Sequence, residues 1–190
     1  MSEKSKRILL LASGTGSLAK SIMEAVASGE LDCEIIGLLS DKDAPVLALA
    51  AQFHIPTIYL PMKKERQQWN DELLARVAEL DPDLVVSVGF MRILAPEFVQ
   101  RFSVINTHPS LLPAFPGAHA VRDALAAGAR VTGSTVHWVD AGMDTGPVIA
   151  QREVAITPGV SEDLLHEEIK IVERALIVEV LQKYATEGEL

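Results

Sequence analysis

Short aliphatic runs alternate along this chain with longer segments in which apolar residues recur at helical spacing. Four runs predict buried strands, because each is short, aliphatic and bounded by residues that break regular structure: Arg7–Ala12, Glu34–Ser40, Leu84–Val88 and Ser103–Thr107. The segments between them predict helices over Leu18–Ala27, Pro45–Phe53 and Glu65–Leu80. Such alternation is typical of a parallel, doubly wound sheet, whose functional sites lie at the carboxyl ends of the strands.

The second half of the chain has a different pattern. Val131–Val139 and Val148–Val154 predict two later strands of the same sheet, with antiparallel pairing. A long closing helix is expected from Ser161, a good N-cap residue, to about Lys183. The predicted fold class is therefore α/β: a three-layer α/β/α, Rossmann-like fold with a mostly parallel sheet and antiparallel strands in its C-terminal half.

Length, charge and cysteine usage narrow the class of protein. The 190 residues suit one domain, 1–190, with a substantial core. With 26 acidic and 17 basic residues, the net charge is −9, the opposite sign from that of a typical nucleic-acid binder. Cys33 is the single cysteine, which excludes an internal disulfide and a thiolate zinc cage. No apolar run approaches the roughly 20 residues that span a bilayer. We expect a cytoplasmic protein that binds neither nucleic acid nor membrane.

A glycine-rich loop, Ser13–Ser17, joins the first predicted strand to the first predicted helix. Glycines let the backbone approach an anion, and the helix N-terminus supplies free N–H groups, so the loop predicts phosphate binding. Gly14-x-Gly16-x-x-Ala19 also fits a dinucleotide fingerprint, and Asp41 follows the second strand where a ribose-binding acid would lie. This loop is compatible with three interpretations: it binds a nucleotide, it binds the cofactor of a nicotinamide-dependent oxidoreductase, or it is a tight turn without a ligand.

The segment from Asn106 to Pro113 carries the strongest chemical signal. Asn106 and His108 are two residues apart at the end of a predicted strand, so both side chains point into the same crevice. An amide donor beside an imidazole can hold a developing oxyanion and move a proton. The alternative is a histidine that only closes a strand end.

A third polar element lies in the glycine-rich loop that contains Asp140 and Asp144. A carboxylate from this loop, placed against His108, would stabilise the protonated imidazole. Asp140 and Asp144 are both candidates, and their spacing does not choose between them.

Together these elements resemble the folate-dependent formyltransferases. The resemblance covers nearly the whole chain, from Arg7 to the closing helix. It is carried by Ala12–Ser17, by Gly89-Phe90-Met91-Arg92-Ile93-Leu94, by Asn106–Pro113 and by Asp144-Thr145-Gly146-Pro147. It implies the formyltransferase fold, with a nucleotide-binding half of about 7–105 and a catalytic, folate-binding half of about 106–190.

The resemblance also implies roles for individual residues. Asn106, His108 and Asp144 match the catalytic trio of the family. The residues matched to the nucleotide's phosphate and ribose are Gly16, Ser17, Leu18, Lys170 and Glu173. Leu18 departs from the asparagine of many members, as does Thr15, so at position 18 only the backbone N–H can serve the phosphate.

Folate binding is implied for a second set of positions. These are Arg66, Met91, Arg92, Ile93, Leu94 and Asn106, with the loop from Asp140 to Asp144 facing the pterin. The implied co-substrate is 10-formyltetrahydrofolate, and the implied acceptor is the amine of 5-phosphoribosylglycinamide, a reaction of de novo purine biosynthesis. Neither a metal nor a covalent enzyme intermediate is required. Two alternative functions stay open: another formyl-folate enzyme and a non-catalytic nucleotide-binding module. The oligomeric state also stays open, with a homodimer as one candidate.

Overall fold

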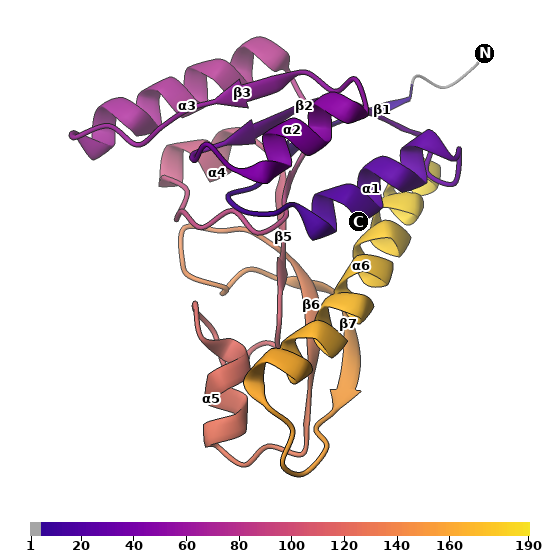
Figure 1. Cartoon of the computed structure of the whole chain (residues 1–190). Helices are drawn as coiled ribbons and strands as arrows, with labels where there is room; N and C mark the ends of the chain where they lie inside the picture. The colour runs from indigo at the N-terminus through magenta and orange to yellow at the C-terminus, as the bar shows by residue number, and fades with distance from the viewer. Residues whose placement is uncertain (1–4) are drawn as a thin grey trace.

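The computed structural model describes residues 5–190, which form one seven-stranded sheet with helices against both faces (Figure 1). The strand order is β3-β2-β1-β4-β5-β6-β7. The strands are β1 (Lys6–Leu11), β2 (Cys33–Ser40), β3 (Thr57–Tyr59), β4 (Leu84–Ser87), β5 (Val104–His108), β6 (Val131–Trp138) and β7 (Val148–Ala155).

The sheet changes direction at β5. Strands β3, β2, β1, β4 and β5 are parallel, whereas β6 runs antiparallel to β5 and β7 runs antiparallel to β6. Asn106 is paired with Ser87 of β4 on one side and with His137 of β6 on the other. This register brings three polar side chains from three strands to one level of the sheet.

The helices are α1 (Ser17–Ala27), α2 (Pro45–Gln52), α3 (Arg66–Leu80), α4 (Pro96–Arg101), α5 (Ala120–Ala126) and α6 (Glu162–Glu187). Two apolar clusters hold five of these helices to the sheet, and a third joins Val121 of α5 to Leu165 and Ile169 of α6. Ile8 and Leu10 of β1 pack with α1, α2 and α6, whereas Leu9 and Leu11 pack with α3 and α4. Because alternate residues of a strand point to opposite faces, β1 is covered on both faces and is aliphatic from Ile8 to Leu11. In Figure 1 the yellow end of α6 lies beside the indigo α1.

The predicted fold class is confirmed, and each predicted strand and helix is present within a few residues of its expected bounds. Ser161 caps α6 by accepting a hydrogen bond from the Leu164 N–H. Three short elements, β3, α4 and α5, were not predicted. The seven strands form a single sheet. The division into a nucleotide-binding and a folate-binding half stays a prediction. Among residues 5–190, no helix is both long and apolar enough to cross a membrane.

Candidate active site

The carboxyl ends of β1, β4 and β5 meet at one edge of the sheet. Because β2 lies on one side of β1 and β4 on the other, the connections diverge there, and this is the place where open α/β sheets bind ligands. The loop after β1 and the loop after β4 are tied together, since the Ser13 N–H donates to the Gly89 carbonyl (3.0 Å). Both loops carry predicted binding residues, and Asn106 and His108 lie at the end of the neighbouring β5.

Asp144 joins the polar side chains of this edge into one cluster. Its Oδ2 atom lies 3.5 Å from Nδ1 of His108, and its Oδ1 atom lies 3.7 Å from Nε2 of His137. His137 Nε2 in turn lies 3.3 Å from Nδ2 of Asn106. The structure thus brings together the three predicted catalytic side chains and adds His137. We call these four residues the polar cluster.

The backbone aims the Asp144 carboxylate. Asp144 has a left-handed conformation (φ 56°), which is uncommon for a residue with a side chain. The Gly117 N–H donates to Asp144 Oδ2 at 2.8 Å, and this bond holds the carboxylate beside His108. Asp140 has a different environment, because its Oδ1 accepts from the Gly142 N–H (3.0 Å) and from the Thr145 hydroxyl (2.7 Å). Asp144 therefore faces the imidazole, while Asp140 stabilises the loop.

The two histidines of the cluster differ in their partners. Burial lowers the pKa of His137, which favours the neutral ring. Its Nδ1 lies 2.9 Å from the Trp138 carbonyl, which can only accept, so Nδ1 carries the proton and Nε2 is a free acceptor. Nε2 of His108 lies 2.8 Å from the Phe115 carbonyl, while its Nδ1 faces Asp144. His108 thus has an acceptor at each nitrogen, an arrangement that suits a ring with two protons.

Gly146 protects the Trp138 carbonyl on which the His137 tautomer depends. It lies so close that a Cβ atom at position 146 would overlap with the carbonyl oxygen. Glycine is therefore required here by space, although its conformation is one that other residues adopt.

The glycine loop has the geometry of a tight strand-to-helix turn. Gly16 is left-handed (φ 81°), and a Cβ atom there would overlap with the Val46 side chain of α2. The first amides of α1, beginning at Ser17 and Leu18, have no acceptor within the helix. The Leu18 side chain is buried in the core, so its backbone is the part that can face a ligand.

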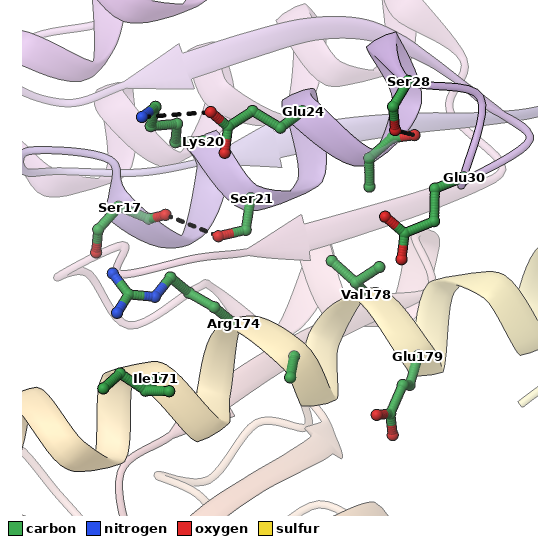
Figure 2. Close-up of a pocket in the computed structure, with 12 residues that line it drawn as sticks. Ser17, Lys20, Ser21, Glu24, Ser28, Glu30, Ile171, Arg174, Val178 and Glu179 are labelled. Atoms are coloured by element: carbon green, nitrogen blue, oxygen red, sulfur yellow. Dashed lines mark hydrogen bonds and ion pairs between the residues drawn. The ribbon is translucent and has the colours of Figure 1, made fainter.

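An open groove of about 720 Å³ begins beside this loop and runs between α1 and α6. Figure 2 shows Arg174 extending from α6 toward Ser17 at the start of α1. Arg174 was not among the predicted binding residues. Of the two that were predicted on α6, Lys170 donates to Glu167 (2.8 Å), and neither Lys170 nor Glu173 lines this groove.

Glu173 is a buried carboxyl on α6 beside β5. Its side chain is 4% exposed, and burial raises its pKa to about 7, while the neighbouring Thr107 hydroxyl and the Lys170 and Arg174 charges lower it less. Near neutral pH this group is therefore close to half protonated, and it can both donate and accept a hydrogen bond.

Asp41 is engaged by the protein itself. Its carboxylate is buried, accepts from the Ser13 hydroxyl, and lies 2.6 Å from Nε of Arg92. Because both oxygens have partners, Asp41 is not placed to bind the ribose of a dinucleotide. The same pair fixes Arg92, and Ser13 accepts from the Met91 N–H (2.9 Å), so the loop after β4 is anchored to the glycine loop.

A second open groove, of about 580 Å³, contains most of the predicted folate contacts. It is lined by Arg66 of α3 and by Met91, Arg92, Ile93 and Leu94 after β4. Arg66 donates to the Ile93 carbonyl and to Asn70 (2.9 Å), and it stacks over Trp69. Met91 and Ile93 are 65% and 63% exposed, so this groove offers apolar surface to a ligand.

Within residues 5–190, no three histidine, cysteine, aspartate or glutamate side chains are grouped so that they could hold a metal ion.

Comparison with known proteins decides the family. A sequence model described as formyl transferase matches residues 6–181, which is most of the chain. The chain belongs to the formyl transferase family. This membership makes the chain an enzyme of the formyltransferase class, and the oxidoreductase interpretation is therefore wrong.

Individual formyl transferases are similar over nearly their full length. A phosphoribosylglycinamide formyltransferase of Mycobacterium tuberculosis is 47% identical over 186 residues, which cover 96% of this chain and 86% of the relative. The solved phosphoribosylglycinamide formyltransferase of Bacillus halodurans is 37% identical, with a TM-score of 0.91 and 97% of each chain covered. A glycinamide ribonucleotide transformylase of Symbiobacterium toebii has a TM-score of 0.92 at 32% identity, covering 96% of this chain and 89% of its own.

Three features of this formyl transferase site were missed by sequence reasoning. Ser87 contacts Asn106 from β4, His137 contacts Asn106 from β6, and Arg174 lines the groove between α1 and α6; no catalytic or binding role was predicted for any of the three from the sequence. No sequence signal predicts the contact of Ser87, since it depends on the register between two strands.

Proposed function

We propose that this chain transfers the formyl group of 10-formyltetrahydrofolate to the amine of 5-phosphoribosylglycinamide. The products are the N-formylated ribonucleotide and tetrahydrofolate, in de novo purine biosynthesis. The observation that carries the proposal is the polar cluster at the sheet edge, together with relatives named for this reaction.

The nucleotide is proposed to bind at the glycine loop and α6. The amides at Gly16, Ser17 and Leu18 would hold its phosphate at the positive end of the α1 dipole. Lys170 and Glu173 would contact the ribose, and the half-protonated carboxyl of Glu173 suits a hydroxyl that both donates and accepts. Because the chain has a net charge of −9, local cations must offset long-range repulsion of this anionic substrate.

The folate is proposed to bind in the groove beside α3. Its apolar surface would cover the exposed side chains of Met91 and Ile93, with Leu94 behind them. Arg66 supplies positive charge for the anionic part of the folate, and Arg92, whose Nε is paired with Asp41, offers its remaining N–H groups. The loop from Asp140 to Asp144 would face the pterin and bring the formyl group toward the polar cluster.

The chemical step begins when the amine of the nucleotide attacks the formyl carbon. The carbonyl oxygen becomes negative in a tetrahedral intermediate, and Asn106 and protonated His108 donate hydrogen bonds to it. A well-placed donor of this kind lowers the barrier by about 3–4 kcal/mol. His108 must exchange the Phe115 carbonyl for the substrate oxygen, because that carbonyl now accepts from Nε2.

Asp144 is proposed to keep His108 protonated and, through water, to take a proton from the attacking nitrogen. The same proton then passes to the folate nitrogen, and the bond from that nitrogen to the formyl carbon breaks to release tetrahydrofolate. Cys33 is unsuited to covalent catalysis, because burial raises the pKa of its thiol to about 11 and so disfavours the thiolate.

The decisive measurement follows tetrahydrofolate formation by absorbance, with and without 5-phosphoribosylglycinamide. We expect release only when the nucleotide is present, together with one formylated nucleotide per folate. Release at the same rate without the nucleotide would instead indicate a formyl-folate hydrolase. Cytoplasmic location and a homodimer stay predictions, to be checked by fractionation and by sedimentation of the purified protein.

A further inference from the structure

We propose that Ser87 is a positioning residue that fixes which end of the Asn106 carboxamide faces the reacting formyl group. The inference rests on the proposed function and adds a residue to its site. Ser87 is the last residue of β4, is 5% exposed, and lies directly beside Asn106 in the parallel β4–β5 register.

The hydrogen bonds around Asn106 specify both ends of its amide. Neutral His137 has its proton on Nδ1, so its bare Nε2 must face the amide NH₂ group (3.3 Å) rather than the amide oxygen. The Asn106 oxygen then points toward β4, where the Ser87 hydroxyl donates to it at 2.8 Å. A carboxamide held at its oxygen and at its nitrogen cannot rotate without breaking a buried hydrogen bond, which is unfavourable.

This arrangement leaves the catalytic hydrogen in a defined place. Nδ2 carries two hydrogens, and His137 is the acceptor found for one of them among residues 5–190. The other is the hydrogen that can meet the substrate oxygen. A donor at the amide oxygen also polarises the amide, because linked hydrogen bonds strengthen one another, and this makes its N–H a better donor.

Removing the hydroxyl tests the proposal. In Ser87→Ala the amide oxygen loses its partner, and the carboxamide can rotate away from the productive orientation. We expect kcat to fall about threefold to tenfold, the range for one hydrogen bond, with little change in KM for either substrate. Ser87→Thr keeps the hydroxyl, so its kcat is expected to be close to that of the wild type.

The matched control is Ser40→Ala. Ser40 is also a buried serine at the end of a strand, but its hydroxyl donates to the Lys42 carbonyl (2.8 Å) and does not contact Asn106. Its loss is expected to leave kcat unaltered. Equal kcat losses in the two alanine variants would assign the effect to general destabilisation and overturn the proposal.

A double-mutant cycle with Asn106→Ala separates positioning from a structural role. If Ser87 acts through Asn106, then Ser87→Ala should have almost no effect on kcat in the Asn106→Ala background. The same fold loss in both backgrounds would refute the proposal, whether or not the threonine variant folds.

A readout without substrate keeps the inference separate from the proposed function. The side-chain NH₂ resonances of Asn106 can be assigned by their absence in Asn106→Ala. We expect them to shift in Ser87→Ala and to stay in place in Ser40→Ala. Unmoved resonances in Ser87→Ala would overturn the inference even if the wild-type enzyme is active. Inactivity of the wild-type enzyme with a clear shift would count against the proposed function alone.

Discussion

The two histidines of the polar cluster differ in which ring nitrogens carry protons because their hydrogen-bond partners differ. The Trp138 carbonyl holds the proton of His137 on Nδ1, which turns Nε2 toward Asn106 as an acceptor. His108 has the Phe115 carbonyl at one nitrogen and the Asp144 carboxylate at the other. Two imidazoles in one cluster can therefore have separate tasks, one orienting the amide and the other donating to substrate.

Asp144→Asn tests the carboxylate that faces His108. Asparagine tolerates the left-handed backbone at this position, and its oxygen can still accept from Gly117, so the loop should be preserved. Loss of the negative charge removes the group that stabilises protonated His108. We expect kcat to fall about 100-fold, as for loss of a general acid or base, measured by steady-state assay.

The control for that variant is Asp123→Asn, which neutralises an exposed carboxylate on α5 and should leave kcat unaltered. An Asp144→Asn enzyme with wild-type turnover across the pH range would remove Asp144 from the mechanism.

Glu173→Gln tests the buried carboxyl on α6. Its pKa of about 7 in the folded protein lies above the ordinary value of 4.5, so the native state binds the proton more tightly than the unfolded chain does. The wild-type protein should therefore lose stability as pH rises from 4.5 to 7, by about 3 kcal/mol from this group. The glutamine variant lacks this loss.

Urea unfolding at pH 4.5 and pH 8 measures the effect. The free energy of unfolding of the variant, compared with that of the wild type, should be higher at pH 8 than at pH 4.5. Glu168→Gln, which alters an exposed carboxyl on the same helix, should show no such difference. A stability difference for Glu173→Gln that is the same at both pH values would contradict the raised pKa.

The contrast between Asn106 and Ser87 shows what the sequence predicts of this site. Asn106 and His108 are predicted because their residue types and short spacing match a known chemistry, whereas Asp144 is preferred to Asp140 only through the resemblance to the formyltransferases. Ser87 is an ordinary serine at the end of an aliphatic run, and its contact exists only because β4 and β5 pair with these two residues side by side. The register between parallel strands is set by packing over the whole sheet. It therefore cannot be predicted from the sequence of one strand.

Among the structural elements, the helices α1 and α2 meet at the glycine loop, and Gly16 is the residue that permits this contact. A side chain at position 16 would be strained by the left-handed backbone and would also overlap with Val46. We expect Gly16→Ala to destabilise the protein by about 2–4 kcal/mol, the sum of the two effects, measured by urea unfolding.

Two companion variants separate these effects. Gly14→Ala places a methyl group where no atom lies within 4 Å, so it should cost much less stability. Adding Val46→Ala to Gly16→Ala removes the overlap but leaves the backbone strain. Equal stability losses in Gly14→Ala and Gly16→Ala would show that contact with α2 is unimportant.

Long elements were predictable from the sequence, and short ones were not. The strands of the sheet core are recognised by their uninterrupted aliphatic runs, and helices α1, α2, α3 and α6 have enough residues to show a helical period. Strand β3 has three residues and helices α4 and α5 have six and seven, too few to establish a period. Pro96 at the start of α4 was the remaining signal, because proline favours the first turn of a helix.

At the scale of the whole molecule, α6 connects the last part of the chain to the first. It packs against α1 and against the antiparallel strands, and with α1 it borders the groove that Arg174 overlooks (Figure 2). A ligand held by both helices binds the folded chain only, and so it should stabilise the entire protein.

We therefore expect 5-phosphoribosylglycinamide to raise the melting temperature. At a nucleotide concentration of about 100 times its Kd, the free energy of unfolding rises by about 2.7 kcal/mol. For a chain of this size, that gain corresponds to a rise in melting temperature of roughly 5–11 °C. Differential scanning fluorimetry checks the shift, with inorganic phosphate at the same concentration as the control. An unmoved melting temperature at saturating nucleotide would place the binding site elsewhere.

Gly146 has no functional group, but its small size has a chemical consequence. A methyl group at this position would displace the Trp138 carbonyl. The His137 ring would then be free to move its hydrogen to the other nitrogen, and the Asn106 amide would have to turn over in response. Through the Trp138 carbonyl and the His137 ring, a glycine that contributes no side chain thus sets the orientation of the Asn106 carboxamide.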